Sequence, residues 1–234
     1  AKWSSEDNLW TIEATRAETG EKLRFTTNFF WMCQGYYRHT EGYTPEWKDM
    51  ARFKGRIVHP QKWPEDLDYK NKRVIVIGSG ATAATLIPAM ANDCAHITML
   101  QRSPTYFRTG RNAIEIAEEL RKLQVDEKWI HEITRRKILF DQDAFTGKTF
   151  EEPEAAKKDL LSAVEAYLGK DYDIATHFTP KYRPWRQRIA FIPDGDLFQG
   201  IKSGKASVVT DEIDRFTEKG ILLKSGKERE ADII

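Results

Sequence analysis

One short stretch of the chain spaces its glycines as a phosphate-binding turn does. Residues 73–90 read RVIVIGSGATAATLIPAM and contain the pattern G-x-G-x-x-A. The first glycine of such a turn permits a sharp bend, the second lets a diphosphate approach the backbone, and the alanine keeps the next helix close to its sheet. The helix N-terminus then stabilises the anion. The residues expected to contact this ligand are Gly78, Ser79, Gly80, Ala81, Thr82 and Ala83. An ordinary strand-to-helix turn is the alternative.

The choice of dinucleotide is read at the end of the next apolar run, where an acidic residue would bind a ribose 2′-hydroxyl and repel a 2′-phosphate. Arg102 and Ser103 stand there, and Arg102 follows Gly78 by 24 residues. A guanidinium can make charge-assisted bonds to a 2′-phosphate, and the serine hydroxyl can add another hydrogen bond. The pattern favours NADPH over NADH and FAD, with a solvated surface arginine as the alternative.

These residues require a strand before the turn, a helix after it and a second strand beyond. Arg73–Ile77 is a β-branched run, Ala81–Ala91 has helical character, and Ile97–Gln101 is a second apolar strand. Strand, glycine-rich turn, helix and strand within about 30 residues predict a parallel βαβ unit.

Antiparallel hairpins are predicted on both sides of this unit. The first joins Leu9–Ala14 to Lys22–Phe30 through a turn at Gly20, and its second strand continues to Cys33. Near the other end, Gly220–Leu223 is expected to form a hairpin with Ala231–Ile234. Between the βαβ unit and this hairpin, strands are predicted at Arg188–Ile192 and Ser207–Thr210, and a short helix at Asp196–Ile201.

Residues from about 111 to 179 differ, because their apolar positions fall at helical spacing. We predict helices over Ala113–Leu123, from a cap at Asp126 to about Leu139, and from Pro153 to Gly169. The predicted fold class is α/β, a three-layer Rossmann-like domain on a parallel sheet with a helical insertion and flanking antiparallel hairpins. The predicted division is a connector over residues 1–64 and a nucleotide-binding domain over residues 65–234.

Composition narrows the kinds of partner. The chain has 234 residues, 31% of them charged, and a formal net charge of +1. No basic excess indicates nucleic acid, and no apolar run approaches the roughly 20 residues of a spanning helix, so we expect neither partner and a cytoplasmic enzyme. Both Cys33 and Cys94 are expected to be small buried residues, because they form no CxxC motif. No histidine has metal-ligand spacing, so no metal is predicted.

A second motif lies just upstream of the glycine-rich turn. Residues 53–64 read FKGRIVHPQKWP, spaced as F-x-G-x-x-x-H-x-x-x-W-P. This string resembles the fingerprint of the flavin-dependent monooxygenases, and its Trp-Pro ending is similar to that of the Baeyer–Villiger branch. The resemblance covers nearly the whole chain. It implies that NADPH reduces FAD and that one oxygen atom of O₂ enters a small organic substrate.

The resemblance also implies roles for single residues. An arginine beyond the helical insertion supplies positive charge beside the flavin in the Baeyer–Villiger branch, and Arg188 matches it best. His59 is implied as a hinge or supporting residue that couples the two nucleotide domains, with a purely structural histidine as the alternative. Independently of the resemblance, Gly55 is expected to have a backbone shape that other residues resist. Related sequences often have Lys where Gln187 stands, so N- or S-oxidation remains an alternative to ketone oxygenation.

The family also binds FAD through an N-terminal G-x-G-x-x-G, and this chain contains no copy of it. We therefore expect a fragment that holds the NADPH-binding part, with the FAD domain elsewhere in the same polypeptide. Two other functions stay open. One is a pyridine-nucleotide disulfide reductase or simple dehydrogenase, against which the missing CxxC argues; the other is a nucleotide-binding module without catalysis of its own.

Overall fold

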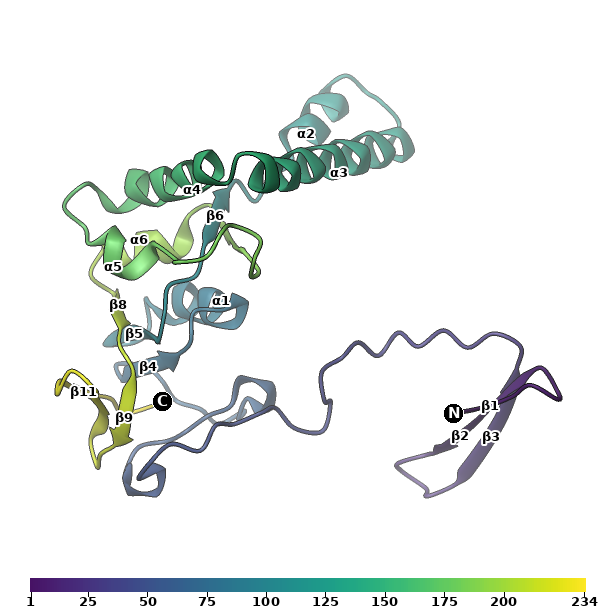
Figure 1. The fold of residues 1–234 in the computed structure, drawn as a ribbon, viewed down its shortest axis with the longest axis horizontal. Coiled ribbons are helices and arrows are strands. Elements are labelled where there is room, and N and C mark those ends of the chain that lie inside the picture. Colours follow the sequence, from purple (N-terminus) through teal and green to yellow (C-terminus); the bar gives the residue numbers. More distant parts are fainter. The chain divides into compact units, whose positions relative to one another are not determined.

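The computed structural model describes residues 1–234, which form two compact units, Ala1–Tyr43 and Thr44–Ile234 (Figure 1). The smaller unit is an antiparallel sheet of β1 (Lys2–Ser4), β2 (Leu9–Thr15) and β3 (Lys22–Thr27) in that order. The predicted hairpin is therefore confirmed. Its second strand is shorter than predicted, because no strand pairs with the residues after Thr27, and Cys33 is exposed rather than buried.

The larger unit contains the predicted parallel βαβ unit. Strands β4 (Arg73–Ile77), β5 (His96–Gln101) and β8 (Ala206–Thr210) pair in parallel in the order β4-β5-β8. Helix α1 (Ala81–Met90) connects the first two strands. The bounds of this unit agree with the sequence prediction to within one residue at each end, because the alternation between β-branched and helical stretches is sharp there.

The hairpin near the C-terminus differs from the prediction. Strand β10 (Gly220–Leu223) pairs with β9 (Ile213–Phe216) and with β11 (Glu228–Glu230), not with residues 231–234. Residues 232–234 instead lie in parallel between β4 and Arg56. The Ile233 carbonyl accepts from the Ile75 N–H at 2.9 Å, and the Ile234 carbonyl accepts from the Val58 N–H at 2.8 Å.

Gly55 is explained by this neighbouring segment and not by its backbone angles, so the expectation of an unusual backbone shape is wrong. Its φ does not lie in the left-handed region. A Cβ at Gly55 would come within 2.3 Å of the Asp232 carbonyl oxygen and 2.5 Å of the Phe53 ring. Glycine is needed because two backbone segments approach each other closely.

The parallel sheet lies between two apolar layers. On one face, Val74, Ile97 and Val208 pack with α1 and with α6 (Asp196–Lys202). On the other face, Ile75 and Leu100 pack with the β9–β11 sheet. Successive strand residues point to opposite faces, so one strand supplies both layers. The three-layer α/β class is confirmed, and Cys94 is buried as expected, with burial raising the pKa of its thiol to about 11.

The helical insertion is also confirmed and lies between β6 (Phe107–Gly110) and β7 (Ala190–Pro193), which pair in parallel. Asp126 caps the second helix as predicted, its carboxylate accepting from the Lys128 N–H. That helix continues twelve residues beyond Leu139. No helix is both long and apolar enough to cross a membrane. The four helices are α2 (Glu115–Lys122), α3 (Glu127–Glu151), α4 (Pro153–Leu168) and α5 (Ile174–Phe178).

The predicted boundary between residues 64 and 65 stays a prediction about the whole protein. Within this structure, residues 44–64 belong to the larger unit. Phe53 is buried there and packs against Phe216 with ring centroids 6.4 Å apart.

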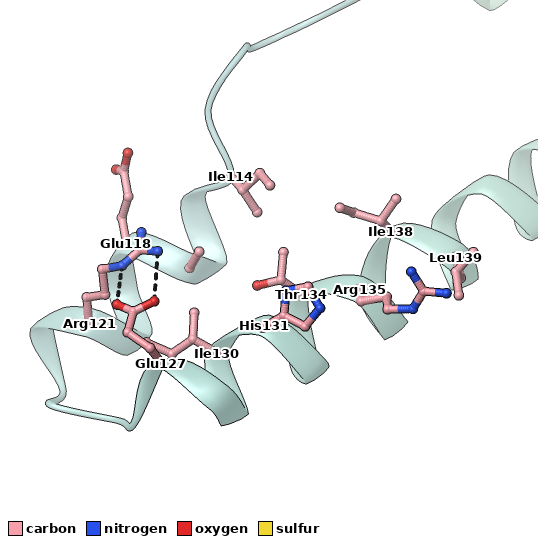
Figure 2. A pocket seen from close by; sticks show the side chains of 11 residues that line it. Ile114, Glu118, Arg121, Glu127, Ile130, His131, Thr134, Arg135, Ile138 and Leu139 are labelled. Atoms are coloured by element: carbon pink, nitrogen blue, oxygen red, sulfur yellow. Dashed lines mark hydrogen bonds and ion pairs between the residues drawn. The ribbon is translucent and has the colours of Figure 1, made fainter. Parts of the chain in front are cut away.

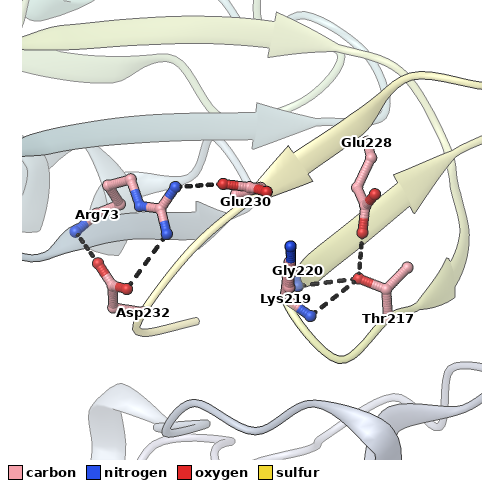
Figure 3. A network of polar contacts seen from close by, with 7 residues as sticks. All are labelled: Arg73, Thr217, Lys219, Gly220, Glu228, Glu230 and Asp232. Carbon is pink, nitrogen blue, oxygen red and sulfur yellow. Dashed lines mark hydrogen bonds and ion pairs between the residues drawn. The ribbon is translucent and has the colours of Figure 1, made fainter.

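An ion-pair network fixes the entry of the chain into the parallel layer (Figure 3). Asp232 accepts from the Arg73 backbone N–H at 2.7 Å, and the Arg73 guanidinium contacts both Asp232 and Glu230. The Arg73 backbone N–H is the main cause that holds the pKa of the Asp232 carboxyl below its usual value, and the guanidinium adds to this effect. The ionised form of Asp232 is therefore more stable in the folded chain than in the unfolded chain.

We expect Asp232→Asn to lower stability at neutral pH but not in acid. A carboxyl whose pKa is lowered by folding stabilises the protein above its unfolded pKa of about 3.9, and this contribution is lost as pH falls through the folded value. The melting temperatures of wild type and variant should therefore differ near pH 7 and converge as pH falls through the lowered pKa of Asp232 in the folded chain. Asp214→Asn, which removes an exposed carboxylate paired only to its neighbour Arg215, is the control. A constant difference across the pH range would contradict this expectation.

Candidate functional site

Strand β4 has parallel neighbours on both of its sides. From β4 the chain proceeds through β5 to β8 on one side, and residues 232–234 return to the other side. In open α/β sheets, ligands bind outside the carboxyl ends of the strands at such a switch point. Gly78 follows β4 and Arg102 follows β5 at this edge, and His59 follows the segment that pairs with residues 232–234. The structure thus brings the predicted glycine-rich turn, Arg102 and His59 to one edge of the layer.

The turn itself has the geometry of an anion site. Gly78 has φ +116°, a backbone conformation that other residues resist, and its N–H donates to the Leu100 carbonyl at 2.7 Å. The first N–H bonded within α1 is that of Ala84, to the Gly80 carbonyl. The preceding N–H groups, of residues 81–83, have no acceptor within the helix. They are therefore available to a bound anion.

The space in front of the turn is open. A Cβ built on Gly78 or on Gly80 meets no atom within 4 Å. Neither glycine is therefore required by crowding inside the protein. An open cradle beside free N–H groups fits the diphosphate of a dinucleotide.

The side chains of the turn divide into two sets. Ala81 and Thr82 are exposed at the helix start, whereas Ala83 is buried against the sheet, as its place in the motif requires. Ser79 is also buried, and its hydroxyl lies 2.9 Å from the Thr105 hydroxyl. Ser79 therefore connects the turn to the chain beyond β5.

Arg102 and Ser103 are exposed directly after β5. The Arg102 guanidinium has no hydrogen bond or ion pair within the protein. The pKa of nearby Glu212 is lowered mainly by its hydrogen bond from Lys224, and the charge of Arg102 lowers it further. A cation without a partner at the edge of the switch point is placed to meet an anionic ligand.

Sequence reasoning missed the contacts among three residues next to Arg102: Gln101, His177 and Thr210. The Gln101 amide is buried and donates to the His177 carbonyl at 2.7 Å and to the Thr210 hydroxyl at 2.9 Å. His177 Nδ1 lies 2.8 Å from the same hydroxyl, and burial lowers the pKa of this histidine. These bonds tie the ends of β5, β8 and α5 together. No spacing rule connects residues 101, 177 and 210, so only the fold reveals this set.

His59 is half-buried and begins a single 3₁₀ turn, Pro60–Lys62. Its Nδ1 accepts a hydrogen bond from the Gln61 N–H at 3.2 Å, so this ring nitrogen faces the backbone. This contact shapes the fingerprint segment locally. The hinge role implied for His59 stays a prediction.

Arg188 does not lie in a strand, contrary to the predicted strand from Arg188 to Ile192, because β7 begins at Ala190. It is exposed and sits in a loop that ends at this strand. A cavity of about 340 Å³ is lined by its neighbours Trp185 and Ile189 together with Arg108 and Phe145. The catalytic role of Arg188 stays a prediction.

Another cavity lies away from the turn, between α2 and α3 (Figure 2). It has a volume of about 620 Å³ and is lined by Ile114, Ile130 and Ile138 on its apolar side, with Arg121 bound to Glu127 at its rim. None of the predicted cofactor or catalytic residues lines it. The volume of this cavity alone would therefore point away from the glycine-rich turn.

The sequence of this chain matches a known protein family. Residues 4–137 match the model of the flavin-binding monooxygenase-like family. The chain belongs to this family. The flavin-binding monooxygenase-like assignment covers both the fingerprint at residues 53–64 and the glycine-rich turn, and it confirms the resemblance seen in the sequence.

Relatives of the family extend beyond the residues described. MymA of Mycobacterium tuberculosis is 47% identical over 238 residues, and the FAD-containing monooxygenase EthA of the same species is 45% identical over 235 residues. Each alignment covers the whole of this chain but only 48% and 47% of the relative. The chain therefore spans about half the length of these family members.

Solved structures agree on the fold. A cyclohexanone monooxygenase bound to ε-caprolactone superposes with a TM-score of 0.67 at 20% identity, covering 99% of this chain and 51% of that one. An oxidized steroid monooxygenase bound to NADP superposes with a TM-score of 0.62 at 22% identity, covering 82% and 44%. These solved structures therefore share the fold of this chain.

Proposed function

We propose that the complete protein containing this chain is a monooxygenase that depends on NADPH and FAD. In this proposal residues 65–234 bind NADPH, and residues 1–64 connect them to a flavin domain of the same polypeptide. The observation that supports it best is the open glycine-rich turn at the switch point, with the unpaired Arg102 one strand away. Family membership favours this function over a disulfide reductase or a simple dehydrogenase.

The residues of this chain would divide the work of holding NADPH. The free N–H groups of residues 81–83 bind the diphosphate, Gly78 and Gly80 leave room for it, and Arg102 with Ser103 binds the 2′-phosphate. His59 acts as a hinge next to the turn. Arg188 supplies positive charge beside the reacting centre, where fixed charge stabilises a transition state strongly when water is excluded.

The reaction class follows from the two cofactors. When bound, the two cofactors would supply the electrons that allow one oxygen atom of O₂ to enter the substrate while the other leaves as water. We favour a ketone as substrate, giving an ester or lactone. The solved neighbours of this fold include enzymes named for cyclohexanone and steroid substrates. N- or S-oxidation is the second candidate, because Gln187 stands where the family resemblance implies a lysine next to the arginine.

Purification of the complete protein tests the proposal directly. We expect a yellow protein with FAD absorbance that consumes both NADPH and O₂ during turnover. Ketones, amines and sulfides offered in parallel would separate lactone formation from N- or S-oxide formation. A colourless protein that reduces a substrate without O₂ would contradict the monooxygenase assignment.

A further inference from the structure

Two acidic residues follow β8 at the same edge of the parallel layer as Arg102. Strands β5 and β8 pair in parallel up to Gln101 and Thr210, and the Asp211 N–H donates to the Gln101 carbonyl at 2.9 Å. The chain beyond β8 therefore starts directly beside the residue that precedes Arg102. Glu212 comes next and is exposed, and the charge of Arg102 contributes to the lowered pKa of its carboxyl. A carboxylate thus lies near the cation that is proposed to bind the 2′-phosphate.

A free carboxylate at this edge would oppose the binding of NADPH. An acidic side chain beside the ribose of a dinucleotide accepts from the 2′-hydroxyl of NADH and repels the 2′-phosphate of NADPH. Glu212 follows β8 and not β5, but neighbouring strands of a sheet lie only about 5 Å apart. Its carboxylate is therefore within reach of a ligand bound at Arg102. NADPH can be preferred only if this negative charge is neutralised or held away.

Lys224 holds this carboxylate in an ion pair. Its Nζ donates to Glu212 Oε2 at 2.5 Å, and its backbone N–H donates to the Glu212 carbonyl at 2.8 Å. Lys224 directly follows β10, so these two bonds join the turn between β10 and β11 to the chain after β8. Both side chains are more than half exposed, which leaves the pair open to solvent and to a ligand. The carboxylate is thus fixed in place by the backbone and paired with a positive charge.

We propose that Lys224 is a positioning residue that sets the preference for NADPH over NADH by holding and neutralising Glu212 beside Arg102. This inference rests on the proposed function. With Lys224 in place, the three side chains together carry a net positive charge toward the 2′-phosphate. Without Lys224, the released carboxylate repels the phosphate and competes with it for the Arg102 guanidinium. NADH has no 2′-phosphate, so neither effect weakens its binding.

Variants of the complete protein test this role. Lys224→Met removes the ammonium group but retains the backbone bond to Glu212, Glu212→Gln removes the carboxylate alone, and the double variant removes both charges. Lys219→Met is the matched control, because Lys219 is an exposed lysine at the opposite end of β10. The affinities for NADP⁺ and NAD⁺ are measured by calorimetry at low and at high salt. FAD content and melting temperature establish that each variant is folded.

We expect Lys224→Met to weaken NADP⁺ binding about fivefold at low salt, the effect of about one unit charge acting at short range through water. Binding of NAD⁺ should not weaken. The loss of NADP⁺ affinity should shrink at high salt, because salt screens exposed charges. In the Glu212→Gln background, Lys224→Met should cause no loss, since no carboxylate is released. Lys219→Met should match wild type.

Unchanged NADP⁺ affinity in Lys224→Met would overturn the inference, and so would an equal loss of NADP⁺ and NAD⁺ binding. The same loss in the Glu212→Gln background would overturn it too, because Lys224 would then act without Glu212. A loss that persists at high salt would assign the effect to packing rather than charge, again against the inference. If Lys224→Met does not fold, Lys224→Gln removes the same charge and must give the same result. A wild-type protein that prefers NADP⁺ but does not oxygenate would refute the proposed function alone, and the affinities of the variants then still decide the role of Lys224.

Discussion

Arg188→Ala should abolish oxygenation while leaving reduction of the flavin by NADPH intact. Removing one preorganised charge or donor aimed at a developing negative charge lowers turnover about 100- to 1000-fold. The exposed Arg188 lies in a loop whose ends are fixed at Tyr182 and Ala190, so its loss should not disturb the glycine-rich turn. Stopped-flow absorbance under anaerobic conditions would measure flavin reduction, and product formation in air would measure oxygenation.

The matched control for this change is Arg186→Ala. Arg186 is also exposed in the same loop, and its backbone N–H bond to the Arg183 carbonyl survives the substitution. Arg188→Lys should recover part of the activity, since an ammonium keeps the charge but loses the planar fork of donors. Equal losses of oxygenation in Arg186→Ala and Arg188→Ala would show that oxygenation depends on the loop as a whole and not on the Arg188 guanidinium.

Arg102→Ala should weaken NADPH binding about 10- to 100-fold and leave NADH binding nearly unchanged. A hydrogen bond to a charged group contributes about 1.5–3 kcal/mol, and a tenfold change in affinity is about 1.4 kcal/mol. NADH lacks the 2′-phosphate, so it cannot lose this contact. Because Arg102 has no hydrogen bond or ion pair inside the protein and only its charge acts on exposed Glu212, its removal should hardly change the melting temperature. Rates of flavin reduction at varied NADPH and NADH concentrations give both affinities.

Arg215→Ala controls for a general loss of positive charge at the surface. Arg215 is a part-exposed arginine of β9 that pairs with its neighbour Asp214. Arg215→Ala should change neither the affinity for NADPH nor the affinity for NADH. A parallel loss of NADPH and NADH binding in Arg102→Ala would reject the 2′-phosphate contact.

The sequence predicts best where local pattern decides the structure. The strand at Arg73–Ile77, the turn and the helix after it agree with the structure because β-branched, glycine and helix-forming residues change sharply there. The cap at Asp126 and the stop at Gly169 are likewise local signals. Residues 141–147 of α3 contain Asp and Gly, which disfavour helix, yet the helix continues because it is supported by the Lys137–Asp141 ion pair one turn apart and by contacts with α4.

Errors occur where the partner of a segment is distant in sequence. Residues 231–234 are extended, as their apolar character indicates, but they pair with β4 and Arg56 rather than with the nearby β10. Residues 28–33 contain strand-forming side chains without a neighbouring strand, and Trp31 is 77% exposed. The contacts among Gln101, His177 and Thr210 are invisible for the same reason. The residue pattern of a segment predicts its conformation more reliably than it predicts which other segment it pairs with.

The insertion of residues 232–234 beside β4 has a consequence for the order in which the domain forms. Arg73 and Asp232 are separated by 159 positions along the chain. Closing a loop of that length costs entropy before any contact compensates for it, and such long-range pairing slows folding. During synthesis, the edge of β4 therefore stays unpaired until almost the last of these residues has left the ribosome. Residues 232–234 are thus the last part of the parallel layer to be synthesised, and until then the open edge of β4 must be protected from edge-to-edge aggregation.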